Sequence, residues 1–314
     1  MHPETIATIV AASSPLVFAV LGETLTEKVG VVNLSLDGSM LLAAMVGFAI
    51  AFTTGSVELG FLAAALASSL VALIIVFTSI ELRLNQIAIG LILTLLGTKL
   101  AAFLGQDFVR QVGPSVQARA IPYLEDIPYL GKIFFDHNPV VYASFLAIVL
   151  VYTFLFHTRH GLELQSSGER PEAAFAKGIP VNRLRYIYTA LGGALVGIGG
   201  AAFSLDVKLG WSEGHIANFG WIALAIVIFG GWHPVRAALG CYIFGALQII
   251  ALRLQPELPG LSQVLPILPF PIMILTLVAV NHPLIRKIGL RSSVLGKIVR
   301  SDPPAALGRP FWRE

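Results

Sequence analysis

Residues 57–79 read VELGFLAAALASSLVALIIVFTS, an apolar run with a single charged residue, Glu58, at its second position. A helix of about 20 apolar residues crosses the hydrocarbon core of a bilayer, which is roughly 30 Å thick. The run is long enough and apolar enough for this. It therefore predicts a membrane-spanning helix.

The composition of the chain indicates bulk lipid as its solvent. Hydrophobic residues fill 56% of the 314 positions and charged residues 12%, whereas a soluble domain carries about 25% charged residues. The single cysteine, Cys241, excludes an intrachain disulfide and a cysteine metal cluster. Residues 1–4 lack the basic start of a cleaved signal, so the first apolar stretch is expected to be retained.

Comparable apolar runs predict an all-α, polytopic transmembrane helix bundle of about eight to nine spans over residues 1–282. Backbone groups in lipid must be paired internally, so the spans are helices, and the alternation of barrel strands is missing. The predicted spans lie near residues 5–21, 37–54, 57–79, 86–105, 138–156, 184–203, 217–231, 236–252 and 265–281.

Lysine and arginine predict which loops face the cytoplasm. The loop at 157–185 and the tail at 283–314 are basic, so both are expected to be cytoplasmic, and the even number of spans between them agrees. The loop at 106–137 has no positive excess and is expected on the periplasmic side of a bacterial inner membrane. Nine spans would place the N-terminus on that side as well.

A polar segment, GETLTEKVGVVNLSLDG at 22–38, separates two apolar runs. Irregular backbone at membrane depth is tolerated only beside protein or a water-filled cavity, and broken helices often border a transport pathway. From its residues alone the segment is first of all an ordinary interfacial loop, and the alternative is such a break beside a transport pathway.

A short helix is predicted within the basic loop, in GERPEAAFAKG at 168–178. Pro171 suits a first helical turn, Glu172 favours the positive end of the helix dipole, and Gly178 after Lys177 marks the end. About two turns are unstable alone. The helix therefore needs a surface, which is either the bundle's own face or a partner protein.

Glycines recur through residues 192–245. Small residues at such spacings let membrane helices approach closely, so this stretch predicts a tightly packed bundle and no particular function.

Motifs of catalysis are missing from the sequence. There is no phosphate-binding P-loop, HExxH or GxSxG. An enzyme is therefore not expected, no cofactor or metal is expected, and active transport would need a partner or an ion gradient. An intramembrane enzyme and an ion-coupled secondary transporter are the alternatives, and the latter would need inverted repeats and a membrane-embedded carboxylate.

Three ordered blocks carry a resemblance to a known family. They are GETLTEKVGVVNLSLDGSM at 22–40, GERPEAAFAKGIPVNRLRY at 168–186 and GWIALAIVIFGGWHPVRAALGCYIFGALQIIALRLQ at 220–255. From about residue 15 to 281 the chain resembles permeases of the branched-chain amino acid, ribose and nucleoside class of ABC importers. The first block and residues 251–255 are most similar to the nucleoside and simple-sugar branch. Lys28, Asp37 and Arg170 depart from the residues usual in the family.

The resemblance implies a permease subunit that translocates a small polar solute, a nucleoside or simple sugar, into the cytoplasm. It implies separate ABC ATPase subunits, a second permease copy or a related permease, an extracytoplasmic solute-binding protein and membrane lipid as partners, with no nucleic acid. It makes the short helix a coupling helix that docks on the ATPase. The coupling residues it implies are Gly168, Glu169, Pro171, Glu172, Ala173, Ala174 and Gly178.

Candidate residues for the solute path are Asn33, Ser35, Asn85, Gln86 and Lys99. Amides and hydroxyls can hydrogen-bond a neutral sugar or ribose without burying a charge. Asn85 and Gln86 alternatively start a helix. Lys99 alternatively extends its amine to the membrane interface.

Overall fold

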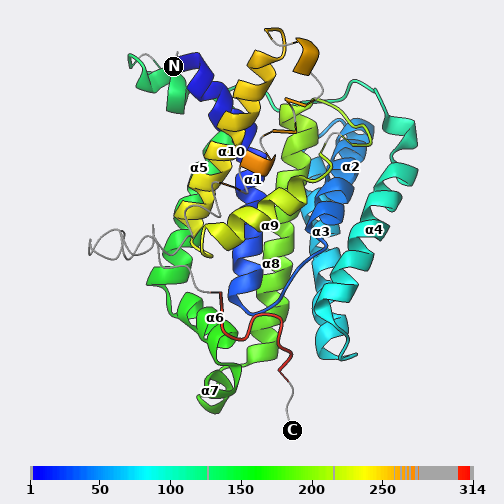
Figure 1. The fold of residues 1–314 in the computed structure, drawn as a ribbon, viewed down its shortest axis with the longest axis vertical. Helices are drawn as coiled ribbons and strands as arrows, with labels where there is room; N and C mark the ends of the chain where they lie inside the picture. The colour runs from blue at the N-terminus through cyan, green and yellow to red at the C-terminus, as the bar shows by residue number, and fades with distance from the viewer. Residues whose placement is uncertain are drawn as a thin grey trace.

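A computed structural model describes residues 3–125, 127–214, 216–257, 259–261, 264–265, 267–268, 270–272, 275 and 303–311. Figure 1 shows a bundle of helices in this part of the chain, which contains no strand apart from an isolated bridge between Val109 and Trp211. The predicted all-α bundle is confirmed. Its α-helices are α1 (Pro3–Lys28), α2 (Leu36–Thr54), α3 (Val57–Ile80), α4 (Gln86–Leu104), α5 (Pro139–His157), α6 (Arg159–Glu169), α7 (Pro171–Ala176), α8 (Val181–Ala202), α9 (Phe219–Phe229) and α10 (Pro234–Leu254). Short turns of other helix types are η1 (Gln106–Phe108), η2 (Gly131–Phe135), η3 (Phe203–Val207) and η4 (Pro259–Leu261).

The number of spans corrects the prediction of eight to nine. Within the described residues, 7 helices are long and apolar enough to cross a membrane. The predicted span at 217–231 is the 11-residue helix α9, which at a rise of about 1.5 Å per residue is far shorter than a bilayer core. The predicted span at 265–281 lies mostly outside the described residues, so nothing is added to the count there.

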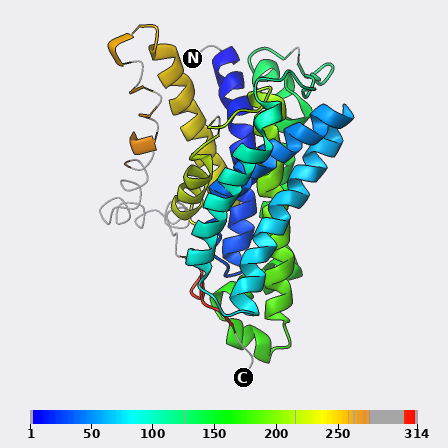
Figure 2. The same cartoon turned by 90° about the vertical axis from the view of Figure 1, so that its right-hand side faces the viewer.

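The central helices are α1, α2 and α8, and the others surround them. Most of the apolar length of α1, α2 and α8 is buried inside the bundle, whereas 33% or less of it is buried in α3, α4, α5 and α10. Figures 1 and 2 both show α1 running through the middle, with α8 beside it. The exposed faces of the outer helices carry large apolar side chains, as expected for surfaces that meet lipid.

Close contacts through glycine set the helix spacing, as predicted from residues 192–245. A Cβ added to Gly22 of α1 would lie 2.3 Å from the carbonyl oxygen of Gly192 in α8. One added to Gly197 would lie 2.3 Å from the carbonyl oxygen of Ala64 in α3, and one on Gly200 would lie 2.5 Å from that of Met40 in α2. The backbone of α8 therefore touches three neighbouring helices where any side chain would prevent contact.

The first helix is longer than predicted. It continues through the polar residues after 21 to Lys28, and the irregular connection is confined to residues 29–35. The hydroxyls of Thr24 and Thr26 donate to the carbonyls of Val20 and Gly22, at 2.7 and 3.2 Å. These threonines satisfy their polar groups within the helix, so their polarity does not end it.

The two ends of the bundle differ in what they carry. Figure 1 shows the N-terminus and residues 106–137 at one end, and α6, α7 and residues 303–311 at the other. The predicted basic loop and the described residues of the C-terminal tail thus share one end, and the loop with no positive excess lies opposite. Which end faces the cytoplasm stays a prediction.

Candidate functional site

The connection between α1 and α2 holds two of the candidate path residues, both buried. The side-chain oxygen of Asn33 accepts hydrogen bonds from the backbone N–H of Ser35 at 3.1 Å and from its hydroxyl at 2.6 Å. The Ser35 and Ser39 hydroxyls are 2.9 Å apart. Asn33 therefore turns the chain into α2, and both side chains are already engaged within the protein.

Gln86 joins the start of α4 to this connection. Its side-chain oxygen accepts from the backbone N–H of Val32 at 2.9 Å, and its amide donates to the Ser79 hydroxyl at 2.7 Å. Neighbouring Asn85 is exposed and caps α4, accepting from the backbone N–H groups of Ile87 and Ala88. Asn33, Ser35 and Gln86 are thus assembled in one place, with Asn85 at its rim.

Lys99 is not part of that assembly. It lies about 20 Å further along α4 than Gln86, at the helical rise of 1.5 Å per residue. Its side chain is exposed, on a stretch of α4 where Leu95, Leu96 and Phe103 are exposed too. The structure therefore separates Lys99 from the other four candidates.

Two buried carboxylates of α1, Glu23 and Glu27, were missed as site residues by the sequence reasoning. Glu23 is 0% exposed and Glu27 is 3% exposed. A carboxylate oxygen of Glu27 accepts a hydrogen bond from the indole N–H of Trp232. Among the described residues neither oxygen of Glu23 has a hydrogen bond of good geometry, although the backbone and side-chain N–H groups of Asn33 are directed at it. Two acidic residues one helical turn apart in a membrane helix were the available signal.

The third sequence block meets the first at both ends of α9. At its start, the backbone N–H of Gly220 donates to a carboxylate oxygen of Asp37 at 3.0 Å. At its end, Trp232 reaches Glu27. The turn between α9 and α10 contains His233, whose pKa is lowered by burial and by nearby positive charge.

The second block forms α6 and α7, and it also reaches the first. A Cβ on Gly168, at the end of α6, would lie 2.1 Å from the carbonyl oxygen of Lys28. Arg185, near the start of α8, is 0% exposed, and none of its three side-chain nitrogens has a hydrogen-bond partner among the described residues. Its guanidinium lies 3.1 Å from the place a Cβ would take on Gly30. The three blocks therefore converge around residues 22–40.

The short helix α7 has the ends predicted from the sequence. Pro171 is its first residue, and Gly178 follows it with a φ of 82°. The backbone N–H groups of Gly178 and Ile179 donate to the carbonyls of Phe175 and Ala174, at 2.8 and 3.1 Å, which closes the helix in a Schellman motif. The helix is thus fixed at its end by its own backbone.

The two faces of α7 differ. Pro171 and Ala174 are buried against the bundle, whereas Glu172 and Ala173 are exposed. Glu169, just before the helix, is exposed and accepts from the backbone N–H of Ala305 at 3.2 Å. Both surfaces that the sequence left as alternatives are therefore present, a face seated on the bundle and a face open to a partner.

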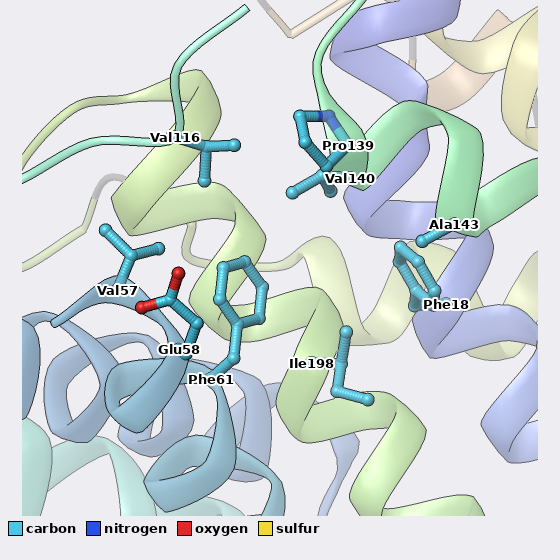
Figure 3. Close-up of a pocket in the computed structure, with 9 residues that line it drawn as sticks. All are labelled: Phe18, Val57, Glu58, Phe61, Val116, Pro139, Val140, Ala143 and Ile198. Carbon is cyan, nitrogen blue, oxygen red and sulfur yellow. The ribbon is translucent and has the colours of Figure 1, made fainter. Parts of the chain in front are cut away.

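A pocket of about 320 Å³ near the start of α3 has mostly apolar walls, unlike the polar connection between α1 and α2 (Figure 3). Its only ionisable side chain is Glu58, and the rest is apolar. Such walls cannot satisfy the hydroxyls of a sugar, so this pocket is no candidate for a polar solute. Its lining residues are Phe18, Val57, Glu58, Phe61, Val116, Pro139, Val140, Ala143 and Ile198.

Comparison with known proteins gives one family. The family model described as "Branched-chain amino acid transport system / permease component" matches residues 5–277. The chain is 34% identical over 250 residues to a putative glucose ABC transporter permease protein, TsgC13, of Haloferax volcanii, covering 78% of this chain and 76% of the relative. It is 34% identical over 272 residues to the nucleoside ABC transporter permease protein NupC of Lactococcus lactis, covering 82% and 85%. It is 36% identical over 199 residues to the guanosine ABC transporter permease protein NupQ of Bacillus subtilis, covering 61% and 56%. No solved structure matches the chain.

Proposed function

The chain belongs to the branched-chain amino acid transport system permease component family, and from this premise we propose that it conducts a nucleoside or simple sugar into the cytoplasm of a bacterium. It is the membrane-spanning subunit of an ABC importer and not an enzyme, and ATP is hydrolysed on separate subunits. The observation that carries the proposal is the convergence of the end of α6, the start of α8 and both ends of α9 on the polar connection at residues 22–40. The nucleoside and sugar permeases among its relatives support this solute class.

The ATPase subunits dock on the exposed face of α7, at the cytoplasmic side of the inner membrane. The docking residues are those implied by the family, with Glu172 and Ala173 facing outward and Pro171 and Ala174 holding the helix on the bundle. The Schellman motif satisfies the carbonyls at the end of α7, and α7 is proposed to move as one unit when the ATPase subunits move. Coupling requires that it contact the ATPase differently in two states, since equal contacts shift no equilibrium.

The solute passes beside the polar connection, between two permease copies or a copy and a related permease, after delivery by an extracytoplasmic binding protein. Asn33, Ser35, Asn85 and Gln86 stay the proposed path residues. All four are hydrogen-bonded within the chain, so a solute would replace these partners when the pathway opens. Lys99 would reach the solute only where a second copy covers the exposed face of α4.

An ion-coupled mechanism has one observation in its favour, because Glu23 supplies the membrane-embedded carboxylate that it needs. Membership of an ABC permease family argues against it. The two mechanisms differ in their source of energy.

Uptake into proteoliposomes distinguishes the ATP-coupled from the ion-coupled mechanism. The permease is reconstituted with its ATPase and binding protein, and entry of labelled guanosine and labelled glucose is measured. We expect uptake of one of these probes to require ATP and to be indifferent to a proton or sodium gradient. Uptake driven by either gradient without ATP would overturn the ATP-coupled importer.

A further inference from the structure

Residues 303–311, named here the C-terminal strap, form a compact segment and not a free tail. The backbone N–H of Leu307 donates to the carbonyl of Pro304 at 3.0 Å, and that of Arg309 donates to Ala306 at 3.1 Å. Pro304, Ala306 and Phe311 are buried. Three buried side chains in so short a stretch mean that the strap is held by the bundle.

One side of the strap is attached to α6 and α7. The backbone N–H of Ala306 donates to the carbonyl of Gly168 at 2.9 Å, beside the bond from Ala305 to Glu169. The Phe311 ring, 8% exposed, lies 5.5 Å from the Phe175 ring of α7, centroid to centroid. Phe311 also packs with Ala174 and Val181. Its side chain therefore fills the space between α7 and the start of α8.

The other side of the strap is attached to the connection between α1 and α2. The backbone N–H of Gly308 donates to the carbonyl of Gly30 at 3.1 Å. Gly308 has a φ of 73°, and a Cβ on it would lie 3.2 Å from a methyl group of Val32. Figure 2 shows the strap beside the ends of α3 and α4, where Gly308 and Pro310 share a pocket with Asn85 and Gln86.

We propose that the C-terminal strap transmits the movement of α7 to residues 29–35. This inference rests on the proposed function, in which the ATPase moves α7. Otherwise α7 is supported mainly by α6 and α8. The strap adds a second link, because one short segment bonds both to the coupling region and to the connection that holds Asn33 and Ser35. Phe311 is its positioning residue at α7, and Gly308 is its attachment to the connection.

The test follows movement of the connection directly and needs no knowledge of the solute. Leu34→Cys places a thiol on the connection, at a half-buried position that the strap does not bond. The natural Cys241 is buried and should not react. The rate of maleimide modification is measured in the permease–ATPase complex, without nucleotide and with ATP plus orthovanadate. In the otherwise wild-type chain we expect the two rates to differ at least about threefold.

Phe311→Ala should bring that ratio close to one while the ATPase still co-purifies. Ala306→Pro, which removes the N–H donated to Gly168, should do the same without altering a large side chain. Phe134→Ala, at an exposed phenylalanine of η2 at the opposite end of the bundle, is the matched control and should keep the wild-type ratio.

The strap proposal is overturned if the ratio is unchanged by both strap variants, or if the wild-type connection does not respond to ATP. Failure of the proposed function looks different, since no ATPase would then bind the wild-type chain. Retention of the ATPase by the variants, with loss of the response at Leu34→Cys, excludes simple misfolding of the docking face.

Discussion

At the scale of single residues, the contact between Trp232 and Glu27 joins the third sequence block to the first. Both side chains are buried, and among the described residues the indole N–H donates a hydrogen bond to this carboxylate. Replacing one partner of a buried hydrogen bond leaves the other unsatisfied, which costs about 1–3 kcal/mol. The pair is therefore expected to be important for stability as well as for position.

Trp232→Phe tests this contact, because it keeps an aromatic ring and removes the donor. We expect the midpoint of thermal unfolding in detergent to fall, in line with a loss of about 1–3 kcal/mol. Trp221→Phe, at a partly exposed tryptophan of α9, should leave the midpoint nearly unchanged. Equal midpoints for the two variants would contradict a stabilising role for the bond to Glu27.

Residue roles were predictable from the sequence only where local chemistry decides them. The capping of α4 by Asn85 was predictable, because its side chain accepts from the backbone N–H groups of Ile87 and Ala88, which follow it directly in the sequence. Gln86 bonds to Val32 and Ser79, which lie 54 and 7 residues away in the sequence. A local sequence pattern does not predict such partners. Glu23 and Glu27 were read as part of a polar break, since their burial depends on helices far away in the chain.

At the scale of elements, α9 is a short helix held at both ends by carboxylates from the first block. A Cβ on Gly220 would lie 2.2 Å from the Cα and the backbone nitrogen of Asp37. Helix propensity by itself predicts that alanine at a helical glycine stabilises by about 1 kcal/mol. Overpacking of the added methyl group against Asp37 predicts instead a destabilisation of about 1–3 kcal/mol.

Gly220→Ala should therefore lower the unfolding midpoint, because the Asp37 backbone cannot move aside as a flexible side chain would. Gly260→Ala provides the control, since a Cβ there meets no atom of the described residues within 4 Å. A midpoint for Gly220→Ala at or above the wild-type value would mean that α9 does not press on α2.

Element prediction succeeded where periodicity and end signals were strong. The helix α7 was foreseen from its proline and glycine, and most long spans from their apolar runs. The region at 217–231 was wrongly predicted to span because hydropathy registers apolar residues and not the turn at Gly230 and Gly231 that ends the helix. Residues 303–311 carry no periodic signal, so their packing on α7 could not be foreseen.

At the scale of the whole molecule, three sequence blocks meet around residues 22–40, and the ATPase is proposed to dock on α7. The most direct measurement is co-purification of the ATPase with the permease, comparing wild type, Glu172→Arg and Glu213→Arg. Glu213 is also exposed but lies beyond α8, in the loop before α9, so it is a matched charge reversal away from α7.

We predict that Glu172→Arg weakens ATPase binding at least about tenfold, because a reversed charge in an interface costs more than 1.4 kcal/mol. Glu213→Arg should retain the wild-type affinity, and both variants should stay monodisperse in detergent. Wild-type affinity in Glu172→Arg, or no ATPase bound to the wild-type chain, would contradict docking on α7.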